Sequence, residues 1–154
     1  MNHPILGKIN SLQSDSGSFE AIISYEGKEI PVQLEIDDRT LDETIELAAN
    51  LIGELKKFDD QSKSIIVKDL LETYNDNWRS YDEKQSDGSF ETVTNPELLQ
   101  DEFKDYFTLS EITVTGNEGI DIWYEDTGLF MGHGIFVQSL DGLDFSEAEA
   151  QLFG

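Results

Sequence analysis

Residues 29–47 read EIPVQLEIDDRTLDETIEL, and within this stretch the sequence pattern changes from that of a β-strand to that of an α-helix. In the first half apolar and polar residues alternate, which predicts a strand with one buried face and one wet face. The alternating apolar residues are Ile30, Val32, Leu34 and Ile36. In the second half, Thr40 and Glu43 form a capping-box pattern, so a helix is predicted to begin at Leu41.

Upstream of this stretch the chain has the pattern of a β-meander. Two short β-rich runs, Ile5–Asn10 and Phe19–Tyr25, precede the strand predicted at Glu29–Ile36. Residues 14–18 separate the first two runs, and Glu26–Gly27 supplies a glycine that suits a tight hairpin. Three N-terminal strands are therefore expected.

Downstream, apolar residues recur with helical spacing over two segments. The first predicted helix runs from Leu41 to Phe58, with Lys56 and Lys57 in its last turn, where the helix dipole favours cations. The second is predicted over residues 61–81. Its apolar face carries Ile66, Leu70, Tyr74, Trp78 and Tyr81.

A polar stretch and a third helix complete the middle of the chain. Residues 82–94 contain Ser86-Asp87-Gly88-Ser89 and are predicted to form an exposed, mobile loop. Asn95-Pro96-Glu97 is typical of a helix start, with a capping Asn and Pro at the first helical position. This helix is expected to continue for about three turns, to Phe107.

From Ser110 onward the two-residue period returns. It predicts a hairpin over residues 110–125, a strand at Ile135–Ser139 and a last strand near Glu147–Leu152. Strands, then helices, then strands predict an α+β fold: an antiparallel sheet from N-terminal and C-terminal strands with about three central helices packed on one face. At 154 residues the whole chain, 1–154, is expected to be a single domain.

The chain is strongly acidic, with 33 Asp and Glu against 10 Lys and Arg and a formal net charge of -23. After Lys104 there are ten acidic residues and no Lys or Arg. Such a surface repels nucleic acid and anionic lipid, so neither is an expected partner, whereas a basic protein is. No oligomeric state follows from the sequence.

Composition also narrows the possible chemistry. The absence of Cys excludes disulfides, thiolate metal sites and thiol nucleophiles. No apolar run approaches the ~20 residues of a membrane span and no leader pattern is present, so a cytoplasmic location is expected. No phosphate-binding glycine motif occurs, and adjacent carboxylates such as Asp59–Asp60 are interpreted as solvated faces or helix caps. No catalytic residue, cofactor or metal site is predicted.

One segment carries a resemblance. Residues 122–135 read IWYEDTGLFMGHGI, in which an aromatic strand leads into an acidic glycine turn and a Gly-His pair. This segment, with Leu6-Gly7-Lys8 near the N-terminus, resembles uncharacterised bacterial domain-of-unknown-function families. Some members of this broad group resemble toxin-immunity proteins. The resemblance implies a non-enzymatic immunity protein, and it carries over no catalytic residues.

His133 within this segment has three possible roles. Between two glycines it can hydrogen-bond a backbone carbonyl or Asp126 and fix the bend. It can also act as a metal ligand or general base with Asp126, Glu125 or Asp121, because imidazole and carboxylate suit both tasks. The third possibility is a role in a partner interface.

Two functional hypotheses follow. The first is a non-enzymatic acidic interaction protein that neutralises a basic toxin such as a nuclease. Its candidate partner-binding residues are Trp78, Tyr81, Asp121, Trp123, Glu125, Asp126 and His133. The second is a cytosolic ligand-binding or regulatory module, or an enzyme centred on His133 and Asp126, which would require a concave pocket holding both side chains.

Overall fold

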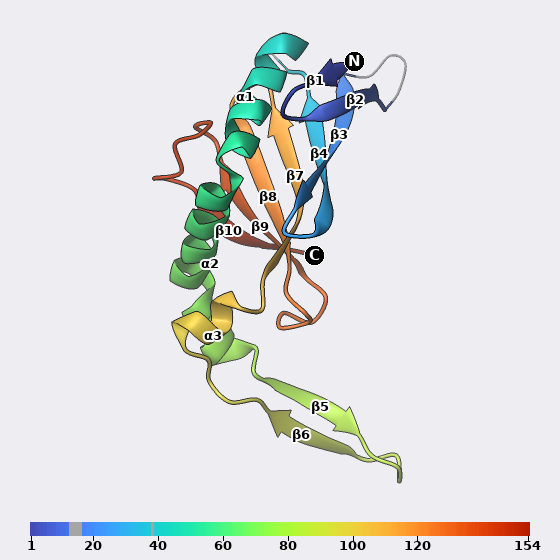
Figure 1. Ribbon diagram of the computed structural model, residues 1–154. Coiled ribbons are helices and arrows are strands. Elements are labelled where there is room, and N and C mark those ends of the chain that lie inside the picture. Colours follow the sequence, from blue (N-terminus) through green and yellow to red (C-terminus); the bar gives the residue numbers. More distant parts are fainter. Residues whose placement is uncertain (13–16, 38) are drawn as a thin grey trace.

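The computed structural model describes residues 1–12, 17–37 and 39–154, and its main element is an eight-stranded sheet (Figure 1). Its N-terminal strands are β1 (Asn2–His3), β2 (Gly7–Ser11), β3 (Ser18–Tyr25) and β4 (Lys28–Glu35). Its C-terminal strands are β7 (Thr108–Thr115), β8 (Gly119–Glu125), β9 (Gly134–Ser139) and β10 (Glu149–Phe153). The strand order is β1-β2-β3-β4-β7-β8-β9-β10.

The predicted antiparallel sheet is wrong, because the sheet is mixed. β4 and β7 pair in parallel, with Val32 opposite Ile112 and Leu34 opposite Val114. A parallel pair requires a crossover connection, which residues 36–107 provide. The described residues do form three central helices, two of them long and one of five residues, but the expected packing of these helices on an antiparallel sheet is wrong.

The turns of the N-terminal meander fit the sequence pattern where they are described. Glu26 and Gly27 form the predicted hairpin between β3 and β4, with φ of 50° and 78°. The separator predicted at residues 14–18 falls partly on residues 13–16, which lie outside the described residues.

The first two helices are α1 (Leu41–Gly53) and α2 (Leu55–Asn77). The predicted start is confirmed, because the Thr40 hydroxyl accepts a hydrogen bond from the Glu43 N–H at 3.2 Å. The predicted end at Phe58 is wrong. The backbone leaves the helical region at Glu54, with φ of -127°, so Lys56 and Lys57 belong to the first turn of α2.

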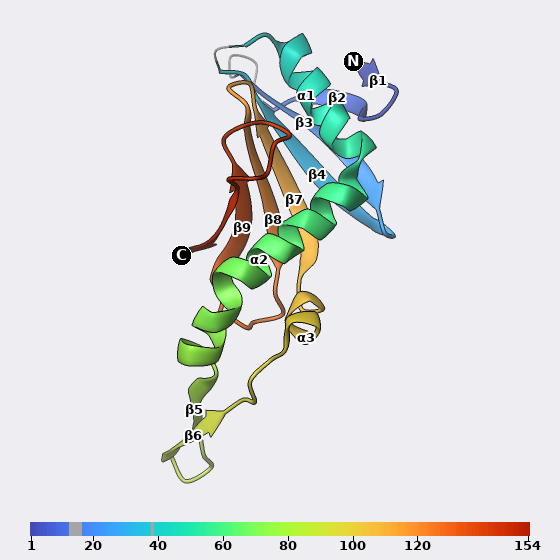
Figure 2. The same ribbon diagram turned by 90° about the vertical axis from the view of Figure 1, so that its left-hand side faces the viewer.

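The loop predicted at residues 82–94 is wrong. This stretch belongs to a separate two-stranded sheet, β5 (Ser80–Lys84) and β6 (Phe90–Thr94), which projects from the body of the protein (Figures 1 and 2). Gly88 in the connecting turn has φ of 87°, which glycine adopts readily. Tyr81, predicted at the end of the second helix, lies on β5 instead.

The third helix is much shorter than predicted. α3 spans Gln100–Lys104 and does not begin at Asn95. The Asn75 side chain on α2 donates to the Leu98 carbonyl at 3.1 Å and accepts from the Leu98 N–H at 3.0 Å. These two bonds hold the segment before α3 against α2 in a non-helical conformation.

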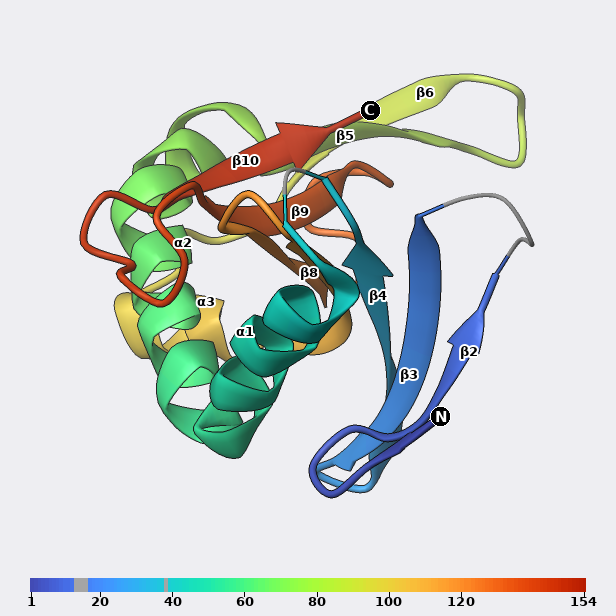
Figure 3. The ribbon, with the colours of Figure 1, turned by 90° about the horizontal axis from the view of Figure 1, so that it is seen from above.

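The sheet curves around the two long helices (Figure 3). α1 contacts β4 and β7, the two strands that pair in parallel, and α2 contacts β9, β10 and α3. The core between them is continuous and includes the fully buried Val32, Leu34, Leu51, Ile66, Phe103, Ile112, Ile122 and Phe130. In the described part of the chain, no helix combines the length and apolar character that crossing a membrane requires.

Candidate partner-binding groove

A groove of about 440 Å³ lies where α2, the β5–β6 hairpin and the β8–β9 connection meet. Its walls are mainly aromatic and apolar. The residues that define it include Tyr74, Trp78, Tyr81, Pro96, Tyr106 and Leu129. Its volume is within the usual range of ligand-binding clefts.

The end of α2 positions one wall of the groove. Tyr74 and Trp78 are four residues apart and therefore lie on the same helix face. The base of the hairpin is fixed by Arg79, whose Nε donates to the Asn75 carbonyl at 2.7 Å and whose Nη1 donates to the Asn95 carbonyl at 2.9 Å. Tyr81 follows directly and brings a third aromatic ring to the groove.

The β8–β9 connection forms the opposite wall, and Asp126 determines its conformation. The buried Asp126 carboxylate accepts hydrogen bonds from the N–H groups of Gly128 and Phe130, both at 3.0 Å. Thr127 and Met131 each have φ of 54°, a rare conformation for residues with a side chain. The Asp126 carboxylate thus holds in place a loop with two left-handed residues other than glycine.

His133 and Phe130 anchor this loop to α2. His133 Nδ1 is 2.8 Å from the Phe130 carbonyl, and the imidazole packs edge-on against Trp78 at 5.1 Å between ring centroids. Phe130 is fully buried and contacts both Tyr74 and Trp78. These contacts favour the interpretation that His133 fixes the bend.

The hypothesis of an active centre requires Asp126 and His133 together in a concave pocket, and the groove does not provide this. Its lining includes Thr127, Leu129 and Met131 from the loop but neither Asp126 nor His133. Within residues 1–12, 17–37 and 39–154, no group of three His, Asp or Glu side chains is placed to hold a metal ion.

Three of the candidate residues lie elsewhere, on the side of β8 opposite the buried Tyr124. Glu125 forms an ion pair with Lys28 at 3.1 Å. Asp121 accepts a hydrogen bond from Gln138 at 2.9 Å, and burial raises the pKa of its carboxyl group. These residues do not share a site with the groove.

Trp123, the third of them, belongs to an aromatic cluster on the same side of β8. Its ring stacks on Phe136 at 4.5 Å and meets Phe153 edge-on at 5.8 Å. The structure therefore brings Trp78 and Tyr81 together at the groove and places Asp126 and His133 behind its wall. Trp123 does not line the groove and packs with Phe136 and Phe153 instead.

The β5–β6 hairpin adds an acidic surface that the sequence did not indicate. In its register Tyr81 lies opposite Val93, and Glu83 lies opposite Glu91. All four side chains therefore project from the same face, which is the face that borders the groove through Tyr81. Like charges directly opposite each other destabilise a strand pair.

Among the described residues, no Lys, Arg or His nitrogen lies within ion-pair distance of Glu83 or Glu91. The nearby Arg79 pairs instead with Glu97, at 3.8 Å. The high strand propensity of Phe90, Thr92, Val93 and Thr94, which are aromatic or β-branched, was the signal from which this strand could have been predicted.

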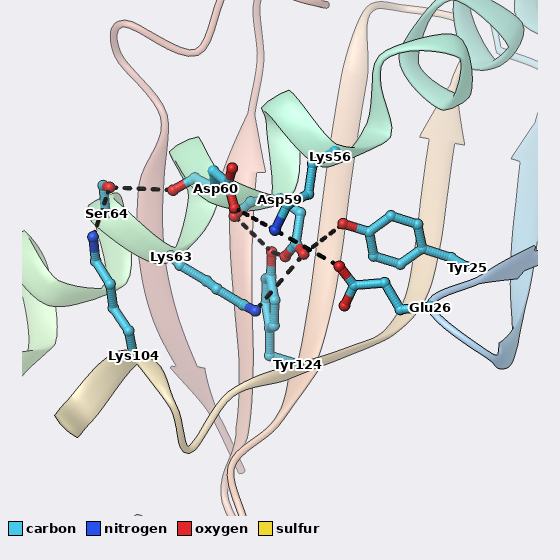
Figure 4. A network of polar contacts seen from close by, with 9 residues as sticks. All are labelled: Tyr25, Glu26, Lys56, Asp59, Asp60, Lys63, Ser64, Lys104 and Tyr124. Atoms are coloured by element: carbon cyan, nitrogen blue, oxygen red, sulfur yellow. Dashed lines mark hydrogen bonds and ion pairs between the residues drawn. The ribbon is translucent and has the colours of Figure 1, made fainter. Parts of the chain in front are cut away.

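A second polar cluster was also missed, and it is structural (Figure 4). Asp59 on α2 is 1% exposed and accepts hydrogen bonds from the phenols of Tyr25 at 2.8 Å and Tyr124 at 2.6 Å. Lys63 Nζ lies 3.7 Å from the same carboxylate. Asp59 is therefore not the solvated residue that its pairing with Asp60 suggested; it ties α2 to β3 and β8.

Burial raises the pKa of the Tyr124 phenol well above its ordinary value, and the negative charge of Asp59 adds to this effect. The pKa of Tyr25 is raised for the same two reasons. The Ser62 hydroxyl lies buried close to the Tyr124 phenol, although it makes no hydrogen bond of standard geometry within the described residues. Both phenols thus stay protonated and donate to Asp59.

Residues 3–149 match the model of a bacterial protein family described as "Uncharacterized protein conserved in bacteria (DUF2262)". Since the match covers almost the whole chain, the protein belongs to this family. Neither the curated proteins nor the solved structures contain a match to the chain.

Proposed function

We propose that the protein is a non-enzymatic interaction protein of the bacterial cytoplasm that binds and blocks a basic protein. The observation that carries this proposal is the groove beside the hairpin. Tyr81 lines this groove, and Glu83 and Glu91, which form no ion pair among the described residues, lie on the same face of the hairpin as Tyr81. Aromatic anchors surrounded by a polar rim are typical of protein interfaces.

The charge of the whole molecule supports the same function. A net charge of -23 attracts a basic partner over a distance and accelerates its association. The hairpin projects from the body, so its acidic residues are accessible to a large partner (Figure 2). Phe90, which is 68% exposed near the hairpin tip, offers a further apolar contact.

The class of partner that fits best is a nuclease or another protein that holds nucleic acid. Such a protein needs a basic surface for its polyanionic substrate, and an acidic protein can compete for that surface. If the basic partner is a toxin, the chain acts as its immunity protein. This role agrees with the resemblance of residues 122–135 to families of which some members resemble toxin-immunity proteins.

The test begins with affinity capture of partners from the native bacterium at low salt, followed by measurement of the dissociation constant with the purified partner. The double variant Glu83→Gln/Glu91→Gln is compared with Glu147→Gln/Glu149→Gln, which removes the same charge from two exposed positions at the start of β10. We expect weaker binding of the first variant by about 10- to 30-fold, since each exposed ion pair contributes up to about 1 kcal/mol.

Two results would overturn the proposal. One is the recovery of no basic protein at low ionic strength. The other is an equal loss of affinity in the two double variants, because binding would then depend on net charge alone and not on the hairpin.

A further inference from the structure

We infer that the groove receives an arginine side chain of the basic partner, an inference that rests on the proposed function. The occupant is identified by two features. One is the aromatic lining of the groove, and the other is its acidic border, by which we mean Glu83 and Glu91 on the same hairpin face as the groove residue Tyr81. Arginine matches both, because its planar guanidinium stacks on aromatic rings and also forms paired hydrogen bonds with carboxylates.

The aromatic lining supplies faces on which a cation can rest. Trp78, Tyr81 and Tyr106 come from the end of α2, from β5 and from the segment after α3, so three separate segments contribute aromatic rings to the groove. Tyr81 is 42% exposed and is the ring nearest in sequence to the acidic face. A cation over such rings is attracted by their π electrons.

The acidic border supplies the complementary charge. Glu83 and Glu91 lie directly opposite each other, and Glu83 is two residues beyond Tyr81 on the same face of β5. Their mutual repulsion is relieved when a cation lies between them. Arg79 at the hairpin base is held by two backbone carbonyls and Glu97, and Lys84, the other cation of the hairpin, points to the opposite face of β5.

A neutral or anionic occupant fits less well. A purely apolar side chain would fill the groove but leave the two carboxylates without a counter-charge. A phosphate or carboxylate group would meet a molecule with a net charge of -23. An arginine on an exposed loop of the partner satisfies both parts of the groove at once.

The inference can be tested without the partner. The probe is the peptide acetyl-Gly-Arg-Gly-amide, with citrulline and norleucine in place of arginine as controls: citrulline keeps the shape without the charge, and norleucine keeps only the apolar character. Binding is followed by NMR through the indole N–H of Trp78, with Trp123 as an internal reference because it lies in a separate cluster.

We expect the arginine peptide to shift the Trp78 signal and leave that of Trp123 in place. Tyr81→Leu should weaken binding by about 2- to 5-fold through loss of the cation–π contact, whereas Tyr81→Phe should retain it. Glu83→Gln/Glu91→Gln should weaken it further than Glu147→Gln/Glu149→Gln does. Equal affinity for the norleucine and arginine peptides, or a shift at Trp123 alone, would overturn the inference.

The outcomes separate this inference from the proposed function. If the arginine peptide binds as described but no basic protein is captured, the proposed function fails and the cation site stands. If a basic protein binds through Glu83 and Glu91 while the arginine peptide leaves Trp78 unaffected, the cation site is wrong and the function stands.

Discussion

At the scale of single residues, the buried Asp59 carboxylate shows how one charge is accommodated inside this protein. Tyr25 and Tyr124 donate to it from two different strands, and Lys63 provides a partial counter-charge from the same helix. Removing one donor leaves a buried carboxylate with fewer partners, which costs more than an ordinary hydrogen bond.

Tyr124→Phe is therefore expected to lower the free energy of unfolding by about 1.5–3 kcal/mol at neutral pH. The pKa of Tyr124 is raised in the folded protein, so its stabilising contribution is fully present below pH 10. This contribution is lost as the pH rises above 10, because the Tyr124 phenol ionises at a lower pH in the unfolded chain than in the folded protein. The difference in unfolding free energy between the wild type and Tyr124→Phe should therefore become smaller above pH 10. Urea unfolding followed by circular dichroism measures this difference.

Tyr81→Phe is the control for this experiment, since it removes a phenol from an exposed hairpin. It should change stability little at any pH. A constant difference between Tyr124→Phe and the wild type from pH 7 to about 11 would contradict the assigned pKa shift.

Gly134 provides a second test at this scale. A Cβ atom at this position would lie 3.1 Å from the Trp123 ring, which is already confined by Phe136 and Phe153. Gly134→Ala should therefore cost about 1–3 kcal/mol of unfolding free energy and alter the tryptophan fluorescence of the folded state. Unchanged stability and fluorescence would mean that Trp123 moves freely.

The Asp59 cluster also shows what the sequence could not reveal. Its members lie on β3, α2 and β8, and neither spacing nor periodicity connects residues 25, 59 and 124. Asp59 next to Asp60 looks like any exposed acidic pair. By contrast, Trp78 followed by Tyr81 at the end of an apolar helix face was visible as an aromatic group, and the groove lies there.

At the scale of elements, the break between α1 and α2 offers a simple experiment. Gly53 is the last residue of α1, its φ is not positive, and an added Cβ would meet no atom within 4 Å. Gly53→Ala should raise the free energy of unfolding by about 0.5–1 kcal/mol, because alanine loses less backbone entropy in a helix.

The matched control is Gly27→Ala, where space is equally open but φ is +78°. This substitution should destabilise the β3–β4 turn. If both variants shift the midpoint of chemical denaturation in the same direction, the backbone argument is wrong.

The β5–β6 hairpin can be shortened without disturbing the main sheet, because it forms a separate sheet. Replacing residues 82–92 by Asn-Gly would join the opposed Tyr81 and Val93 through a two-residue turn. We expect the unfolding free energy to change by less than about 1 kcal/mol, since an isolated two-stranded hairpin is at best marginally stable. Partner binding should be lost, and a large loss of stability would show that the hairpin supports the fold.

The elements differ in how far the sequence determines them. Alternation predicted most strands of the main sheet, since it specifies which face of a strand is buried. It does not specify the neighbouring strand, so the parallel pairing of β4 with β7 was not foreseen. The sequence of the hairpin is typical of a loop because Asp, Ser and Gly at residues 86–89 dominate its centre, although they form only its turn.

At the scale of the whole molecule, the net charge of -23 acts against compactness. Raising NaCl from about 0.02 M to about 0.3 M shortens the distance over which the acidic side chains repel one another. We expect the thermal unfolding midpoint to rise by several degrees over this range while the affinity for a basic partner falls. Circular dichroism and calorimetry measure the two effects, and a salt-independent midpoint would contradict the repulsion.

The parallel contact between β4 and β7 has a consequence for how the protein acquires its structure. The strands β1–β4 and the strands β7–β10 can each pair early, because they are neighbours along the chain. The parallel pair of β4 and β7 forms only after residues 36–107 have brought these two strands together. Contacts between such distant segments form slowly. Until β4 and β7 pair, each of these strands is an edge strand whose free backbone groups can pair with other chains. The interval before this pairing is when a newly made chain is most exposed to aggregation, and a high negative charge keeps such chains apart.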